Sequence, residues 1–279
     1  LGMFEEALHI AEQAVANHGE SLDTLRMLTS ARYGCADMKG AISACKKALE
    51  FGDRPDLHVT LGSALFALGR VDDAIAEYRR ALELAPDFPD ALFHLGLIDL
   101  MRGNYAEGWA GFEQRFRRPR RTAARSCEPA WDGSPLNGRN LLVMREQGLG
   151  DEIMFASCYE HVIEQAGHCV FECDPRLEKL FSRSFPQATF QPLLDLNTLK
   201  HSEPEMPVDA RIYAGSLPRH LRYARQEFPV HQGYLRPDPV RVAEWCARLA
   251  ALGDGLKVGL SWRGGTVFTH RERRTLRLE

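Results

Sequence analysis

The chain has 279 residues, 44% hydrophobic and 26% charged, with a formal net charge of −3 at pH 7. This composition is typical of a soluble protein with room for two domains, and it excludes a global attraction to nucleic acid or an anionic membrane. No apolar stretch approaches the roughly 18 to 20 residues that span a bilayer, and scattered cysteines, odd in number, favour reduced thiols in a cytoplasmic protein.

A period of 34 residues marks the first part of the chain. It separates Gly62 from Gly96 and Gly69 from Gly103. A fixed period of this length is typical of helix–turn–helix repeats of the tetratricopeptide (TPR) type, which form solenoids that bind partners.

The best copy of the repeat runs from Pro55 to Pro86, with its turn at Gly69. Small residues on its two helices allow close approach, and larger ones fill the groove between them. The small positions are Gly62, Ala74 and Ala81, and the large ones are Leu61, Leu65 and Tyr78. This copy resembles the TPR consensus. His58 is expected to be a packed, hydrogen-bonded histidine, as is His94.

The pattern extends in both directions and predicts a repeat array over residues 1–118. One register contains Ala7, Ala41, Ala74 and Gly108, and another contains Ala14, Ala48, Ala81 and Arg115. The array amounts to about three and a half repeats, near the minimum for a stable stack. The segment 2–17 reads as the second helix of a repeat whose first helix is missing, so we expect the chain to begin inside a repeat and to be truncated there. The last copy departs from the pattern, as terminal repeats do when they cap or dock.

Six arginines lie between Arg115 and Arg125. One interpretation is a patch that binds phosphate or nucleic acid. The other is a solvated linker, which we favour because no aromatic platform accompanies the run and Pro119 interrupts it. We place the linker at residues 119–138.

The sequence pattern then changes to alternating strands and helices, which predicts an α/β lobe with a parallel sheet covered on both faces. The predicted strands are 140–144, 168–173, 188–191 and 208–213. Helices are expected from Asp151 to about Gln165, from Asp174 and from Ser216. Cys169 and Cys173 flank one strand, but no second pair at zinc spacing accompanies them, so no metal site is predicted.

A break at 237–239 precedes an amphipathic helix over 240–252, a strand over 256–262 and a Gly-containing loop. This order is how a second α/β lobe would begin. The chain ends long before such a lobe is complete, so truncation is expected at this end too.

The segment 145–153, REQGLGDEI, reads as a strand end, a glycine loop and a helix start. Gly148 and Gly150 permit a tight turn, and ligands of parallel sheets bind beyond the carboxyl ends of the strands. A dinucleotide fingerprint and a triphosphate P-loop are both absent. A structural helix cap at Asp151 explains the segment equally well.

The segment 131–155 closely resembles a motif of bacterial proteins that join TPR repeats to a glycosyltransferase-like domain. Matching pieces include Trp131, Gly133, Gly138 and the run Glu146-Gln147-Gly148-Leu149-Gly150-Asp151, and later 233–239, 257–265 and the Arg-rich 271–276. The domain is related to heptosyltransferases and more loosely to O-linked N-acetylglucosamine transferases.

The resemblance implies two Rossmann-like lobes that face a cleft, with the acceptor lobe at 139–236 and the start of the donor lobe at 237–279. It implies Asp151 as general base, with Glu146 as an orienting residue or substitute base. Gln147, Gly148 and Gly150 would form the acceptor loop. The donor phosphates would lie by Trp262, Arg263, Gly264 and Gly265. The substrate would be a nucleotide-sugar, without a metal or other cofactor.

Three functions remain open. The first is an inverting glycosyltransferase-like enzyme whose repeats recruit a protein or glycan acceptor, with this fragment itself inactive. The second is a TPR scaffold that binds a protein partner and carries a non-catalytic α/β domain. The third, nucleic-acid binding through the arginine run, is the weakest.

Overall fold

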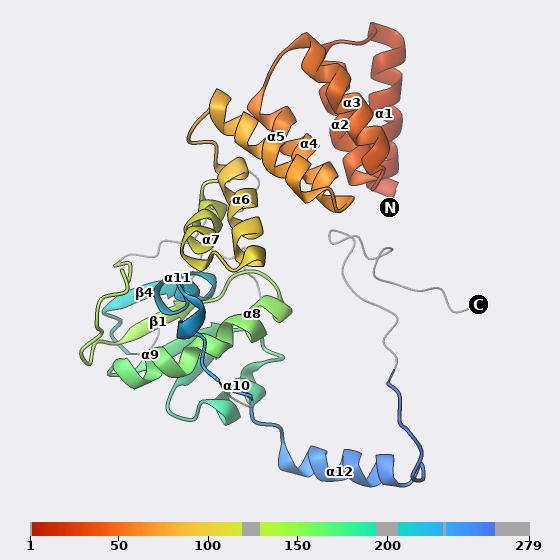
Figure 1. The fold of residues 1–279 in the computed structure, drawn as a ribbon. Helices are drawn as coiled ribbons and strands as arrows, with labels where there is room; N and C mark the ends of the chain where they lie inside the picture. Colours follow the sequence, from red (N-terminus) through yellow and green to blue (C-terminus); the bar gives the residue numbers. More distant parts are fainter. Residues whose placement is uncertain (1, 119–128, 194–205, 231–232, 260–279) are drawn as a thin grey trace. The chain divides into compact units, whose positions relative to one another are not determined.

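The structure is a computed structural model, and it describes residues 2–118, 129–193, 206–230 and 233–259 (Figure 1). The chain forms two compact units. Among the described residues, the first comprises 2–95 and 256–259, and the second comprises those between 96 and 255. Each unit is described by itself below. The domain boundaries predicted from the sequence, including the linker at 119–138, stay predictions.

The first unit is a stack of helices, as the repeat period predicts. Its helices are α1 (Gly2–His18), α2 (Leu22–Gly34), α3 (Met38–Phe51), α4 (Pro55–Ala67) and α5 (Val71–Leu84), and α6 (Pro89–Arg102) begins in it. The pairs α2–α3 and α4–α5 pack against each other as helix–turn–helix units, which Figure 1 shows in red and orange. The repeat array is therefore confirmed.

Close helix approach explains why the repeat needs its glycines. A Cβ atom added at Gly62 would lie 2.7 Å from Cε1 of Tyr78, a ring that is only 1% exposed. A Cβ atom at Gly96, in α6, would lie 2.7 Å from the backbone Cα of Gly111. A side chain at either position would force the helices apart.

His58 lies buried in α4, as a packed and hydrogen-bonded residue. Its Nε2 lies 2.6 Å from Oδ1 of Asp53, and its Nδ1 lies 2.6 Å from Oε2 of Glu77. Both ring nitrogens are thus within hydrogen-bond distance of a carboxylate, so the side chain joins α4, α5 and the α3–α4 loop. His94 stacks on Tyr78, with ring centroids 5.1 Å apart.

The second unit combines the end of the repeats with a four-stranded parallel sheet. Its strands are β1 (Leu141–Met144), β2 (Cys169–Cys173), β3 (Thr189–Pro192) and β4 (Ala210–Tyr213). Its α-helices after α6 are α7 (Tyr105–Phe112), α8 (Leu149–Phe155), α9 (Tyr159–Gln165), α10 (Glu178–Ser184), α11 (Leu217–Leu221) and α12 (Pro239–Ala250). Short 3₁₀ helices are η1 (Glu113–Phe116), η2 (Ala156–Cys158), η3 (Ala214–Ser216) and η4 (Arg225–Glu227).

The strand order is β3-β2-β1-β4, with every neighbouring pair parallel. The chain therefore moves outward from β1 through β2 to β3 and then returns to the other side of β1. The predicted α/β lobe is confirmed, and the order places a reversal of direction at β1.

Alternate residues of the central strands pack on opposite faces of the sheet. On one face, Phe171 contacts an aromatic cluster formed with Tyr159 of α9, Phe181 of α10 and Phe190 of β3. On the other face, the buried cluster consists of Leu142, Met144, Val170 and Tyr213, with Phe116 and Val208 packed against it. Phe116 belongs to η1, so the end of the repeats contributes to the core of the sheet.

The observed elements differ from the predicted ones in three places, and one predicted helix differs in its burial. The helix expected over 151–165 is interrupted by η2, and the helix expected from Asp174 begins at Glu178. No strand is present at 256–259, and residues 260–262 of that prediction lie outside the described residues. Helix α12 forms where expected, but its apolar side chains are exposed, with Trp245 at 51%.

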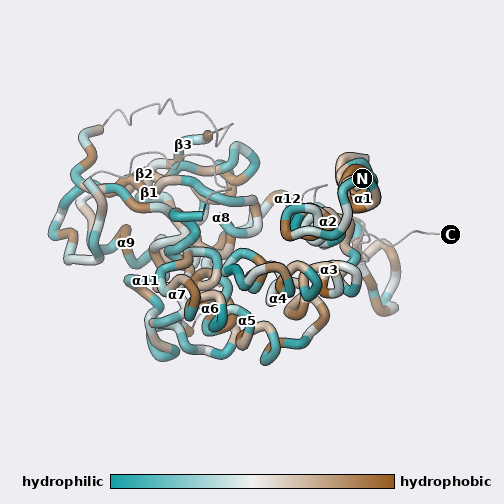
Figure 2. The backbone as a smooth tube through the Cα atoms, turned by 90° about the horizontal axis from the view of Figure 1, so that it is seen from above, coloured by the Kyte–Doolittle hydropathy of each residue, from teal (hydrophilic) through white to brown (hydrophobic). Residues whose placement is uncertain are grey.

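Among the described residues, no helix combines the length and apolar character that crossing a bilayer requires. Figure 2 shows hydrophobic and hydrophilic residues interspersed along the helices.

Candidate functional site

The carboxyl edge of the sheet is the place where the fold favours a ligand. In an open parallel sheet, ligands bind beyond the strand ends at the point where the strand order reverses. Here that point lies between β1 and β4. The residues that follow these strands are the loop 145–148 with the first turn of α8, called the 147–151 loop below, and the 3₁₀ helix η3. The predicted acceptor loop therefore lies at the topologically favoured position.

Arg145, the first residue after β1, joins the ends of three strands. Its backbone N–H donates to Oε2 of Glu172 in β2 at 2.9 Å, and its Nη1 donates to the carbonyl of Leu193, just after β3, at 2.7 Å. Its Nη2 donates to Oδ2 of Asp174 at 2.8 Å, and its Nε donates to Glu152 of α8. With 7% of its surface exposed, Arg145 is a buried structural hub.

The two carboxylates around Arg145 differ in their electrostatics. Hydrogen bonds from Arg176, aided by Arg145, hold the pKa of Asp174 well below its usual value, although burial opposes this. Burial raises the pKa of Glu152, despite the hydrogen bonds that it accepts from Arg145 and from the backbone N–H of Asp174. The pairings satisfy the buried charges, as they must in a low-dielectric interior.

Glu146, the next residue, faces a second cluster. Its two carboxylate oxygens accept from Nε and Nη2 of Arg115 at 3.0 and 2.8 Å, a bidentate pair. Oε1 also accepts from the backbone N–H of Gly215 at 2.9 Å. Both charged side chains are almost fully buried, with 4% of the Arg115 side chain and 1% of the Glu146 side chain exposed. The carboxylate predicted as a substitute base thus forms its hydrogen bonds inside the protein, where it connects the end of β1 with η1 and η3.

The solvated-linker interpretation is wrong for Arg115. Besides Glu146, this arginine contacts Glu113 and donates to Oγ of Ser216 at 2.8 Å, and its guanidinium lies over the rings of Phe112 and Phe116. Burial lowers the pKa of Arg115, but the hydrogen bonds and charges of Glu146 and Glu113 outweigh it and raise the pKa. The arginines at 120, 121 and 125 lie outside the described residues.

The sequence contained a signal for this contact. Arg115 occupies the register that holds Ala14, Ala48 and Ala81 in the earlier repeats. Two of these alanines, Ala48 and Ala81, are fully buried, as expected where helices pack closely. A long charged side chain at the same register marks the place where the last repeat meets a different neighbour. No local sequence pattern indicates which residues pair with Arg115.

The loop between the two clusters has an unusual backbone. Gln147 has a φ of +59°, the left-handed region that side chains with a Cβ seldom adopt. Such a conformation costs about 1–3 kcal/mol and persists when the surroundings impose it. Here two anchored residues, Arg145 and Glu146, precede it. After it, Oδ2 of Asp151 accepts from the backbone N–H of Gly148 at 3.1 Å.

Asp151 is part-exposed at the start of α8 and closes a cap on its own helix. Among the described residues, its other carboxylate oxygen, Oδ1, has no hydrogen bond or ion pair. A Cβ atom added at Gly150 would meet open space, so packing does not require a glycine there. The predicted residues Gln147, Gly148, Gly150 and Asp151 therefore lie together, the first two in the loop before α8 and the other two in its first turn, and all are at least part-exposed. The predicted donor residues Trp262, Arg263, Gly264 and Gly265 lie outside the described residues.

Comparison with known proteins identifies the repeats. Residues 62–101 match the family model described as TPR repeat. The chain is 30% identical over 287 residues to Protein FlbA of Caulobacter vibrioides. This alignment covers 96% of the chain but 48% of FlbA, so the chain spans about half the length of that relative. The chain thus contains TPR repeats, a module for protein interaction, and the name FlbA states no catalytic function.

Several solved structures show partial likeness. MamA is 23% identical over 42% of this chain and 68% of its own, with a TM-score of 0.36. YrrB, described as a TPR protein with an unusual peptide-binding site, is 23% identical over 42% of this chain and 61% of its own, with a TM-score of 0.34. A mutant of the Thermobaculum terrenum O-GlcNAc transferase is 16% identical over 62% of this chain and 37% of its own, with a TM-score of 0.35. At such TM-scores these likenesses indicate no shared function.

Proposed function

We propose that the chain joins a repeat array that binds a protein partner to the acceptor-side lobe of a glycosyltransferase-like enzyme. The observation that carries the proposal is the position of the 147–151 loop at the β1–β4 reversal, where open parallel sheets bind ligands. The family match of residues 62–101 supports the role of the repeats.

The role of Asp151 in this proposal follows from what its neighbours do. Glu146 is occupied by Arg115 and Gly215, so it holds the loop and does not contact substrate. Asp151 uses Oδ2 for its cap and leaves Oδ1 to accept a hydrogen bond from an acceptor hydroxyl. As the hydroxyl oxygen attacks the anomeric carbon of a nucleotide-sugar, Asp151 takes its proton. The nucleoside diphosphate leaves with the electron pair of the broken glycosidic bond.

The experiment is sugar transfer by the natural polypeptide that contains this chain, with a panel of nucleotide-sugars as donors. Asp151→Asn keeps an oxygen that can accept from Gly148 but loses the basic group. We expect turnover to fall about 10²–10⁴-fold with little change in melting temperature. Glu160→Gln, at an exposed position of α9, is the matched control and should retain full turnover.

Equal turnover in Asp151→Asn and the control would remove Asp151 from the mechanism. Absence of transfer with every donor would reject the enzymatic part of the proposal.

A second candidate function is a scaffold, in which the repeats bind a protein and the lobe is not catalytic. The scaffold function is favoured by the internal ion pairs of Arg145 and Glu146, because side chains in such pairs stabilise the fold. In that case a protein partner captured by crosslinking would contact the repeat helices, and Asp151→Asn would leave partner affinity and every other property unchanged.

A further inference from the structure

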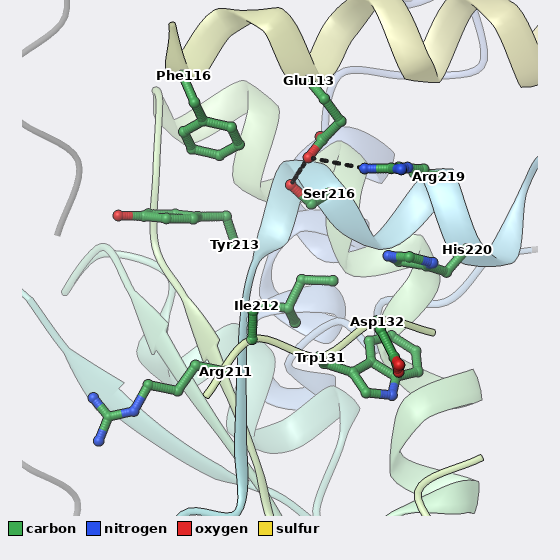
Figure 3. Close-up of a pocket in the computed structure, with 11 residues that line it drawn as sticks. Glu113, Phe116, Trp131, Asp132, Arg211, Ile212, Tyr213, Ser216, Arg219 and His220 are labelled. Carbon is green, nitrogen blue, oxygen red and sulfur yellow. Dashed lines mark hydrogen bonds and ion pairs between the residues drawn. The ribbon is translucent and has the colours of Figure 1, made fainter. Parts of the chain in front are cut away.

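A cavity lies beside β4, and no residue of the 147–151 loop lines it. Its volume is about 440 Å³, within the range of about 300–1,000 Å³ that small-molecule sites occupy. The walls come from η1, the segment 130–132, β4, η3 and α11. Figure 3 shows the residues that line it.

Aromatic rings form two sides of this pocket. Phe116 and Tyr213 pack together with ring centroids 5.0 Å apart, and Trp131 packs on His220 at 5.3 Å. Figure 3 shows the first pair on one side and the second pair on the other. Trp131 is held in place, because its Nε1 donates to the carbonyl of Ser134 at 2.8 Å. Trp131 and Tyr213 are almost fully buried, with 5% and 6% of their surfaces exposed, so a ligand would contact their edges and the half-buried rings of Phe116 and His220.

Polar groups of both kinds surround the rings. The Glu113 carboxylate accepts from Oγ of Ser216 at 2.9 Å and lies 3.9 Å from Nη1 of Arg219. The Arg219 side chain is 53% exposed, and Asp132 is exposed on the opposite wall. The lining thus supplies carboxylate acceptors and guanidinium donors at several points.

The charges of the lining balance. Glu113 and Asp132 are matched by Arg211 and Arg219. Burial, aided by the nearby Arg219, lowers the pKa of His220 and so disfavours a positive charge on this ring. A balanced lining gives no excess attraction to a phosphate or to a polycation. It suits a neutral molecule that has flat apolar faces and hydroxyl groups around its edge.

We propose that this pocket binds a saccharide, with the apolar face of a pyranose ring against Phe116 and His220 and its hydroxyls on Glu113, Asp132 and Arg219. This site is additional to the transfer reaction assigned to Asp151, and it stands whether or not the lobe transfers sugar.

The test is titration of the chain with a panel of neutral mono- and oligosaccharides, followed by the fluorescence of Trp131. Saturable binding is expected for at least one saccharide, and Trp131→Phe should remove the fluorescence change while calorimetry still detects binding. Arg219→Gln and Asp132→Asn alter groups at exposed positions, and Asn can still accept from the backbone N–H of Ser134. Each should weaken binding about tenfold or more, the loss of one well-placed hydrogen bond to a charged group.

Arg225→Gln, at an exposed position of η4 that does not line the pocket, is the control and should bind as the unchanged protein does. No saturable binding by any saccharide, or equal affinity in all variants, would overturn the proposal. Binding of a peptide or a nucleotide with this same dependence on Arg219 and Asp132 would overturn the assignment to saccharides. Loss of activity in Asp151→Asn with unchanged saccharide affinity would separate the pocket from the proposed catalytic loop.

Discussion

Removal of the Arg115 guanidinium should destabilise the second unit strongly. The buried bidentate pair with Glu146 would be replaced by a carboxylate with 1% of its side chain exposed and its main cationic partner gone. Breaking a buried ion pair by removing one partner costs about 3–5 kcal/mol. For a unit of this size, this loss lowers the melting temperature by roughly 6–20 °C.

The pair can be isolated with a double-mutant cycle of Arg115→Met, Glu146→Gln and the combined variant. Unfolding in urea is followed by near-ultraviolet circular dichroism, to which Trp109 and Trp131 of this unit contribute. Because the two side chains contact each other directly, we expect the effects to fall short of additivity by at least about 1.5 kcal/mol.

Arg117→Met is the matched control, because Arg117 is exposed and belongs to the same arginine run. It should change the free energy of unfolding by less than about 0.5 kcal/mol. The reasoning would be refuted if Arg115→Met cost no more than the control, or if the two changes in the cycle were simply additive.

Three further predictions concern other parts of the fold. Gly96→Ala should lower the free energy of unfolding by about 1–3 kcal/mol, because its Cβ would meet the backbone of Gly111; thermal melts check this, and an unchanged melt contradicts it. His58→Gln should cost about 1.5–3 kcal/mol for each hydrogen bond to a carboxylate that it loses, measured by urea unfolding of the first unit, and no loss would reject the bridging role. Asp174→Asn should destabilise the protein most above about pH 5 and progressively less towards pH 2. Hydrogen bonds from Arg176 lower the pKa of Asp174 in the folded state, so the stability that this carboxylate contributes is lost as it becomes protonated. A difference in the free energy of unfolding that does not depend on pH would contradict this.

The elements that the sequence predicted are those with a local signal. The repeats could be predicted because Gly62 and Gly96 recur in register, and the strands because short apolar runs alternate with helices. Element limits carry a weaker local signal: α10 begins at Glu178, four residues after the predicted start at Asp174. A turn precedes the helix there, and the Asp174 carboxylate accepts a hydrogen bond from Arg145.

The interactions at the candidate site could not be predicted in this way. Glu146 pairs with Arg115, 31 residues earlier, and with the backbone of Gly215, 69 residues later. Nothing in the local pattern distinguishes a carboxylate that receives such partners from one that faces a substrate. The left-handed backbone conformation of Gln147 could not be predicted either, because it is imposed by hydrogen-bonded residues on both sides of it.

The central claim is that the end of the repeat array, α7 with η1, is built into the lobe and fixes the candidate loop through Arg115. Hydrogen–deuterium exchange measured by mass spectrometry tests it most directly. We predict that residues 105–116 exchange as slowly as β1 and β4, and that Arg115→Met accelerates exchange both there and in the 147–151 loop. Fast exchange of 105–116 in the unchanged protein, or a loop whose exchange is unaffected by Arg115→Met, would contradict the claim.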